Sequence, residues 1–211
     1  MTAVATASKF WDRLADHYAR QPIADEDAYR TKLRVTQGYF RPDMDVLEFG
    51  CGTGGTAIIH APFVRHISAI DFSEKMLDIA RAKAADAGVA NVSFERADIA
   101  ELTAVDGRYD AVLGLSILHL LEDRDAVIAK VFAMLKPGGI FVSSTTCIGD
   151  TMKIFKFIAP LGKAIGLLPQ LDVMTVPELV ASLSAAGFGI DHQWQPGKGK
   201  AVFIVARKPV A

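Results

Sequence analysis

The chain has 211 residues and a formal net charge of −1 at pH 7. This length fits one domain with a substantial hydrophobic core. The near-neutral charge and the lack of a stripe of basic residues do not fit a nucleic-acid-binding protein. The two cysteines, Cys51 and Cys147, form neither a metal-ligand spacing nor a disulfide framework. We therefore expect no metal and a reducing compartment.

The beginning of the chain lacks a long apolar stretch behind positive charges, so we expect no signal peptide. No apolar run reaches the length that spans a membrane. These features favour a cytoplasmic location.

Residues 8–41 carry apolar and aromatic residues at helical spacing, which predicts two amphipathic helices packed on the edge of a sheet. The residues that set this spacing are Phe10, Trp11, Leu14 and Tyr18, and then Tyr29, Leu33, Thr36 and Phe40.

The run from Val46 to Ala57, VLEFGCGTGGTA, is the most informative part of the chain. It reads as an apolar strand, then a loop dense in glycine, then a helix start. Glycines let a backbone turn sharply and approach a ligand closely, because no Cβ intervenes. The helix start adds unpaired N–H groups and the positive end of a dipole. The pattern predicts a nucleotide or cofactor site at the carboxyl end of a strand.

The cofactor class depends on Glu48. Gly50, Gly52 and Gly55 satisfy the dinucleotide fingerprint G-x-G-x-x-G, which is weak evidence when it stands alone. A carboxylate two residues before the first glycine would repel a pyrophosphate, whereas it suits a ligand with an ammonium group. A merely tight strand-to-helix turn would explain one glycine of this loop but not four.

The rest of the chain alternates strand and helix patterns, which indicates an α/β fold with a parallel sheet. Strands are predicted at His66–Ile70 (followed by Asp71), Val92–Glu95, Tyr109–Leu115 and Ile140–Ser144, and a closing hairpin at Ile190–Gln195 and Ala201–Ala206. Helices are predicted from Ser73 to about Gly88, over Arg124–Leu135 and over Val176–Ala186, and Lys136-Pro137-Gly138-Gly139 is expected to end the second of them.

The loop Glu48-Phe49-Gly50-Cys51-Gly52-Thr53-Gly54 resembles motif I of the class I S-adenosylmethionine-dependent methyltransferases, and the resemblance extends in order from Asp45 to Lys208. It implies a Rossmann-like, doubly wound, mostly parallel sheet with an antiparallel last strand and helices on both faces. We expect one methyltransferase domain over residues 1–211. Its parts are an N-terminal helical lid (8–41), a cofactor-binding core (42–147), a lid insert (148–174) and a C-terminal helix with a strand hairpin (175–211).

The resemblance also implies how S-adenosyl-L-methionine is bound. Gly50, Gly52 and Gly54 shape the loop, Glu48 receives the ammonium group and Asp71 the ribose hydroxyls. Asp98 accepts a hydrogen bond from the adenine amino group, and Ile99 flanks the adenine ring. Cys51, Thr53, Phe72, Met76 and Leu115 complete the expected set.

The transferable methyl group is already electrophilic, so a base is needed only if the acceptor must lose a proton. His119 is the candidate base, because histidine titrates near neutrality and this one follows the strand expected to face the methyl group. A purely structural hydrogen-bonding role is the alternative for His119. Tyr18 is the candidate lid residue that touches cofactor or substrate, against a plain packing role.

Thr151 to Leu171 is strongly apolar and is interrupted by Pro160, Gly162, Gly166 and Pro169. A lid, a dimer contact and a peripheral membrane surface would all have this composition. We favour a lid over a substrate with an apolar or aromatic portion, in a monomer or homodimer.

We therefore expect methyl transfer from S-adenosylmethionine to a small-molecule acceptor. The chain has no Asn-Pro-Pro-Tyr run, which makes amino groups of nucleic acids poor candidates as acceptors. A nicotinamide-dependent oxidoreductase is one alternative, although a Tyr-x-x-x-Lys pair is not recognisable. A non-catalytic cofactor-binding module is another.

Overall fold

The computed structural model describes residues 3–150 and 171–210, and the chain divides into two compact units, Met1–Thr103 and Ala104–Ala211. The expected lid insert lies mostly at 151–170, outside the described residues. The expected single domain and its parts remain a prediction.

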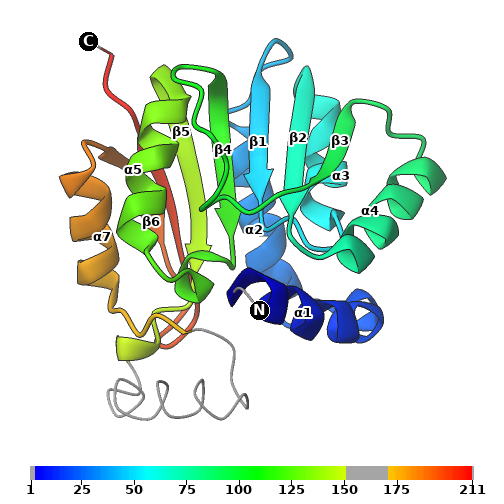
Figure 1. Ribbon diagram of the computed structural model, residues 1–211. Coiled ribbons are helices and arrows are strands. Elements are labelled where there is room, and N and C mark those ends of the chain that lie inside the picture. Colours follow the sequence, from blue (N-terminus) through cyan, green and yellow to red (C-terminus); the bar gives the residue numbers. More distant parts are fainter. Residues whose placement is uncertain (1–2, 151–170, 211) are drawn as a thin grey trace. The chain divides into compact units, whose positions relative to one another are not determined.

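The first unit contains a parallel three-stranded sheet in the order β3-β2-β1 (Figure 1). Its strands are β1 (Asp45–Phe49), β2 (His66–Asp71) and β3 (Val92–Arg96), and its helices are α1 (Ala3–Arg20), α2 (Glu26–Gln37), α3 (Gly55–His60) and α4 (Glu74–Asp86), with a 3₁₀ turn at Ala61–Phe63. In the register of β1 and β2, Glu48 pairs with Ala69 and Phe49 with Ile70. The residues that follow these two strands therefore meet at one edge of the sheet.

Two helices of this unit, α2 and α4, begin at a residue whose side chain caps them. Asp25 accepts a hydrogen bond from the Ala28 N–H at the start of α2, and Ser73 accepts one from the Met76 N–H at the start of α4. The core is built from fully buried apolar residues of β1, β2 and α4, among them Val46, Phe49, Ile67 and Leu77. Burial of these side chains fixes the sheet that carries the glycine loop.

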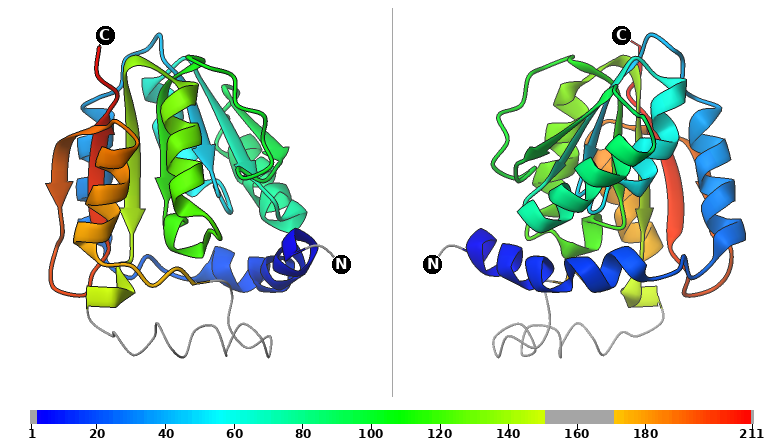
Figure 2. Two further views of the ribbon diagram at one scale, coloured as in Figure 1. Left: turned by 60° about the vertical axis from the view of Figure 1, so that its left-hand side comes forward. Right: turned by 90° about the vertical axis from the view of Figure 1, so that its right-hand side faces the viewer.

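Helix α1 lies across the carboxyl ends of β1 and β2 (Figures 1 and 2). Helices α1 and α2 confirm the two amphipathic helices predicted within residues 8–41.

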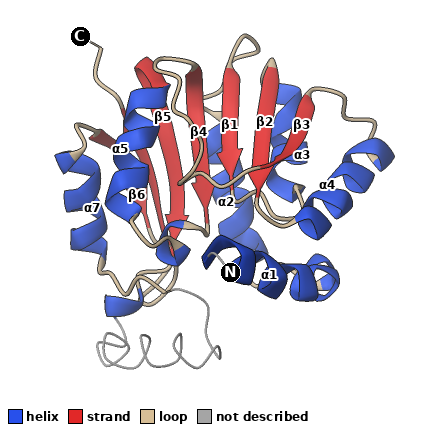
Figure 3. Ribbon diagram, in the orientation of Figure 1, coloured by secondary structure: helices blue, strands red, loops and turns tan. Residues whose placement is uncertain are grey.

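The second unit contains four strands in the order β4-β5-β7-β6. Figure 3 shows them in red, with β4, β5 and β6 labelled. They are β4 (Tyr109–Leu115), β5 (Leu135–Thr145), β6 (Gly189–Trp194) and β7 (Val202–Arg207), and the helices are α5 (Arg124–Met134) and α7 (Val176–Ala185), with 3₁₀ turns at Leu118–Leu120 and Ile148–Asp150. β4 and β5 are parallel, whereas β7 is antiparallel to both β5 and β6. The predicted closing hairpin and antiparallel last strand are therefore confirmed.

The run Lys136-Pro137-Gly138-Gly139 differs from its prediction. β5 begins at Leu135 instead of at Ile140, so this run is part of the strand. Lys208 explains the difference. The Gly138 N–H donates to the Lys208 carbonyl at 2.9 Å, and the Lys208 N–H donates to the Gly139 carbonyl at 2.9 Å. The Lys208 ammonium also donates to the carbonyls of Phe132 and Leu135, which caps the end of α5.

None of the helices within the described residues combines the length and hydropathy that crossing a bilayer requires.

Candidate cofactor site

The glycine loop between β1 and α3 adopts the conformation that only glycine tolerates well. Gly50, Gly52 and Gly54 have φ angles of 64°, 53° and 72°. At Gly54 a Cβ would lie 2.8 Å from Ala80 Cβ and 2.8 Å from Phe94 Cε1, so the loop packs against α4 and β3 with no room for a side chain. At Gly55 a Cβ would meet nothing within 4 Å.

Glu48 is a buried carboxyl group at the end of β1. The residue is 3% exposed, and its Oε2 is buried without a hydrogen-bond partner among the described residues. Burial raises the pKa of Glu48 from its ordinary value of 4.5 to about 8, and the neighbouring charge of Asp71 adds to this rise. An orphaned carboxyl oxygen of this kind calls for a donor, and a cationic one would keep the group ionised.

Asp71, at the end of β2, braces the glycine loop. Its Oδ2 accepts a hydrogen bond from the Gly52 N–H at 2.9 Å, and its Oδ1 accepts one from the Ser73 N–H at 2.9 Å. Burial raises the pKa of Asp71, and the hydrogen bonds that it accepts offset part of that rise. An ionised carboxylate has about four lone-pair positions, so Asp71 retains capacity for hydroxyl donors.

The other expected residues of this unit follow the ends of β2 and β3. Met76 and Ile99 are buried, whereas Phe72 and Asp98 are partly exposed. The Asp98 carboxylate accepts from the Ala100 N–H at 2.8 Å, which fixes the turn after β3. The Phe72 carbonyl accepts from Arg96 Nε at 3.1 Å.

Tyr18 of α1 reaches the glycine loop. A Cβ on Gly52 would lie 3.8 Å from its Cε1, although the residue is 48% exposed. Partial burial raises the pKa of the Tyr18 hydroxyl, and the charges of Asp71 and Glu48 raise it further.

Sequence reasoning missed two side chains that also approach this loop. The hydroxyls of Tyr29 and Thr56 lie 3.3 Å apart. Partial burial raises the pKa of Tyr29, and the charge of Glu48 raises it further. Lys83 of α4 donates to Thr53 Oγ1 at 2.9 Å. The helical spacing of Tyr29 indicated packing alone, and the sequence holds no signal for the partner of Lys83.

Leu115 and His119 belong to the second unit. The Leu115 end of β4 is followed by Ser116, which has a φ of 58°, a sparsely populated conformation that is typical of functional turns. The Nδ1 of His119 is buried and has no partner among the described residues, and burial lowers the pKa of the ring. The His119 carbonyl accepts from the Asp172 N–H at 2.7 Å.

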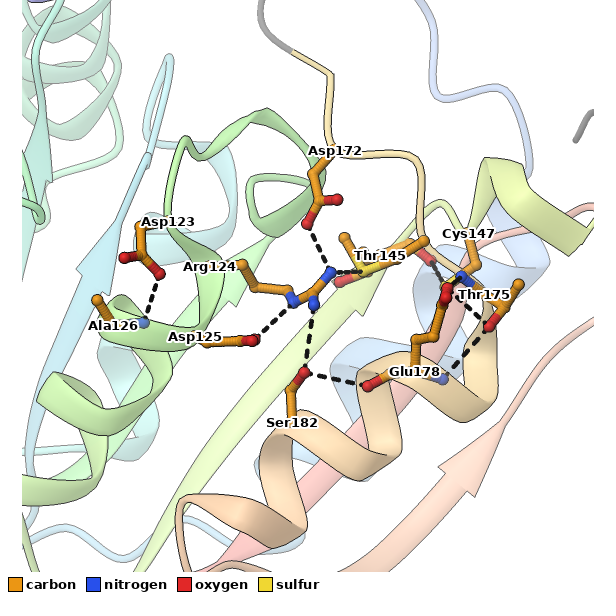
Figure 4. A network of polar contacts seen from close by, with 11 residues as sticks. Asp123, Arg124, Asp125, Ala126, Thr145, Cys147, Asp172, Thr175, Glu178 and Ser182 are labelled. Atoms are coloured by element: carbon orange, nitrogen blue, oxygen red, sulfur yellow. Dashed lines mark hydrogen bonds and ion pairs between the residues drawn. The ribbon is translucent and has the colours of Figure 1, made fainter. Parts of the chain in front are cut away.

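A network of polar contacts around Arg124 joins α5 to Asp172 and to α7 (Figure 4). The guanidinium of Arg124 bonds to Asp172 Oδ2 at 2.5 Å, to Asp125 Oδ1 at 3.1 Å and to Ser182 Oγ at 3.2 Å. Because Asp172 also bonds to the His119 carbonyl, the network links the start of α5, α7 and the turn at His119.

Within the described residues, no three His, Cys, Asp or Glu side chains are grouped so that they could hold a metal ion. Of the expected cofactor-binding residues, all but Leu115 lie in the first unit. Their individual roles remain predictions.

The family comparison agrees with this geometry. Residues 46–139 match the family model described as a methyltransferase domain. The matched stretch begins in β1 and includes the glycine loop, Asp71 and Asp98.

Individual relatives carry methyltransferase names. The chain is 30% identical to a demethylmenaquinone methyltransferase of Leptospira interrogans over 53% of its own length and 46% of the relative. It is 29% identical to a 2-heptyl-1-hydroxyquinolin-4(1H)-one methyltransferase of Mycobacteroides abscessus over 46% of its length and 44% of the relative. The chain thus spans less than half the length of the curated relatives it matches.

A solved structure extends the likeness beyond the matched stretch. The crystal structure of an S-adenosylmethionine-dependent methyltransferase from Mesorhizobium loti has a TM-score of 0.66 and 22% identity, and the match covers 82% of this chain and 96% of that one. At this identity the likeness shows the fold, and it confirms the expected Rossmann-like class I methyltransferase fold.

Proposed function

We propose that this protein transfers a methyl group from S-adenosylmethionine to a small-molecule acceptor. The single observation that carries the proposal is Glu48, whose buried Oε2 has no partner among the described residues beside a glycine loop. The cofactor has an ammonium group that supplies the missing donor. The methyltransferase domain over residues 46–139 supports the same cofactor.

The residues around the loop fit the other parts of this cofactor. We assign Asp71 to the ribose hydroxyls, since both of its oxygens are held in place by backbone N–H groups and retain free lone pairs. Asp98 and the buried Ile99 are assigned to the adenine. Gly50, Cys51, Gly52, Thr53 and Gly54 form the loop itself, and Phe72, Met76 and Leu115 complete the set.

When bound, the cofactor supplies an electrophilic methyl group. The protein then needs chiefly to hold an acceptor in line with it, and positioning of this kind contributes roughly 7–11 kcal/mol in ideal intramolecular models. His119 is our candidate for removing a proton from the acceptor, because its buried Nδ1 has no partner among the described residues. Its lowered pKa leaves the ring neutral, and therefore able to accept a proton, near pH 7.

For the acceptor we propose a small molecule with an aromatic or apolar portion. The names of the two curated relatives support this class, since one acts on demethylmenaquinone and the other on a heptyl hydroxyquinolone. A monomer or homodimer without nucleic-acid partners is expected. Contact with a membrane surface through 151–171 depends mostly on residues outside the described part of the chain.

Calorimetry with S-adenosylhomocysteine tests the cofactor assignment. We expect binding to the wild-type protein, at least tenfold weaker binding to Asp71→Asn, and unchanged binding to Asp86→Asn, a matched control at an exposed acid on α4. NADH should not bind. Heat from NADH and none from S-adenosylhomocysteine would favour the oxidoreductase alternative. Binding without turnover over a panel of quinone, hydroxyquinolone and phenol acceptors would favour a non-catalytic module.

A further inference from the structure

One face of α1 is bonded to the turn that follows β2. Ser8 Oγ donates to the Phe72 carbonyl at 3.4 Å, and Ser73 Oγ donates to Asp12 Oδ1 at 2.6 Å. Ser8 and Asp12 are four residues apart and therefore share a face of the helix, which continues with the buried Ala15. The Asp12 bond is short and charge-assisted, which makes it the stronger of the two.

Ser73 connects this face to the proposed cofactor site. Its side chain is fully buried and caps α4 by accepting from the Met76 N–H at 3.3 Å while it donates to Asp12. Its own N–H donates to Asp71, and Asp71 accepts in turn from the Gly52 N–H. A continuous series of hydrogen bonds thus runs from α1 to the glycine loop.

The other end of α1 reaches the same loop directly. Tyr18 lies against Gly52, with its Cε1 3.8 Å from the position of a Cβ there. Trp11 and Tyr18 are in edge contact, with ring centroids 6.4 Å apart. Helix α1 therefore touches the turn after β2 through Asp12 and the loop after β1 through Tyr18. Because a helix is stiff over two turns, the Asp12 contact sets where Tyr18 lies.

We infer that Asp12 is a positioning residue of the cofactor site: by accepting the Ser73 hydroxyl, it docks α1 across the ends of β1 and β2 and holds Tyr18 against the glycine loop. The expected effect of Asp12 on cofactor binding rests on the proposed function. The docking of α1 does not.

Hydrogen exchange without ligand tests the docking. In Asp12→Ala, we expect the amides of residues 8–20 to exchange about tenfold faster or more, because a charge-assisted bond is lost and the buried Ser73 hydroxyl is left unpaired. Asp12→Asn keeps an oxygen acceptor and should exchange like wild type. Asp16→Ala is the matched control, since Asp16 is exposed on the same helix and the substitution gives the same gain in helix propensity. Equal exchange in Asp12→Ala and Asp16→Ala would overturn the inference.

A double-mutant cycle tests the action through Tyr18. Asp12→Ala should weaken S-adenosylhomocysteine binding about tenfold, and the same change in a Tyr18→Ala background should weaken it less than twofold further. A purely structural role predicts the same loss in both backgrounds, and that result would overturn the positioning role.

The two proposals fail in different ways. If the wild-type protein does not bind S-adenosylhomocysteine, the proposed function is refuted, and so is the ligand-related part of this inference. The exchange comparison then decides the docking role of Asp12 by itself.

Discussion

Replacing Glu48 by glutamine should stabilise the ligand-free protein at alkaline pH while it weakens cofactor binding. Glutamine has nearly the shape of the protonated side chain but cannot ionise. The wild-type carboxyl is buried and carries a pKa of about 8 in the folded protein, against an ordinary value of 4.5. The free energies of unfolding of the two proteins should therefore diverge between pH 4.5 and about pH 8, where the unfolded chain releases a proton that the folded one retains.

The direction of the stability change follows from which state binds the proton. Because the folded pKa is raised, stability from protonated Glu48 is fully present below pH 4.5 and is lost as the pH rises towards 8. At about 1.36 kcal/mol per pKa unit, Glu48→Gln should gain up to about 4–5 kcal/mol over wild type at pH 8.5 and about 1 kcal/mol at pH 5. That gain is large beside the 5–15 kcal/mol that is typical of a whole domain.

Urea denaturation at pH 5, 7 and 8.5 measures the effect. Glu101→Gln, at an exposed position of the same unit, is the matched control and should follow the wild-type curve. Parallel pH profiles for wild type and Glu48→Gln would refute the reasoning, because they would show that Glu48 does not hold a proton in the folded state. The same variant should bind S-adenosylhomocysteine at least tenfold more weakly than wild type at pH 8.

Three further predictions concern the first unit. Binding of S-adenosylhomocysteine should release protons and should strengthen about tenfold per pH unit between pH 6 and 8, because Glu48 must ionise to pair with an ammonium group. Calorimetry in buffers of different ionisation heat measures the number of protons released. Gly54→Ala should lose about 2–4 kcal/mol in urea denaturation, because of its φ of 72° and the contact with Ala80, whereas Gly55→Ala should change stability by less than about 1 kcal/mol. His60 is buried and its pKa is lowered to about 4, so its neutral form contributes stability above pH 6.5 that is lost as the pH falls to 4. His60→Gln should remove this loss, which amounts to about 3 kcal/mol in the free energy of unfolding, as measured by thermal or urea unfolding.

Much of the fold could be predicted because the signals are local. Apolar runs ending in acids predicted β1, β2 and β3, and capping residues such as Ser73 predicted where helices begin. Parallel strands bring their carboxyl ends to one edge, so the proximity of Glu48 and Asp71 followed from the order of elements alone.

The contacts that could not be predicted join residues far apart in the chain. Ser73 and Asp12 are separated by 61 positions, and Lys83 and Thr53 by 30. The local sequence predicts Ser73 as a helix cap, but it carries no signal for the bond from Ser73 to Asp12 or from Lys83 to Thr53, because only tertiary packing selects these partners. The start of β5 was mispredicted for the same reason, since its pairing with Lys208 is set by the far end of the chain.

The electrostatics of the two strand-end acids also bear on which ligand the site accepts. Glu48 and Asp71 are both buried, and the charge of Asp71 raises the pKa of Glu48. Ionising both without a counter-charge is therefore costly, and an anionic pyrophosphate would add to that cost. A ligand with an ammonium group offsets the charge of Glu48, while uncharged hydroxyls at Asp71 add hydrogen bonds without adding negative charge. The feature that destabilises the ligand-free fold at pH 8 is thus the one that favours a cationic nucleoside over a dinucleotide.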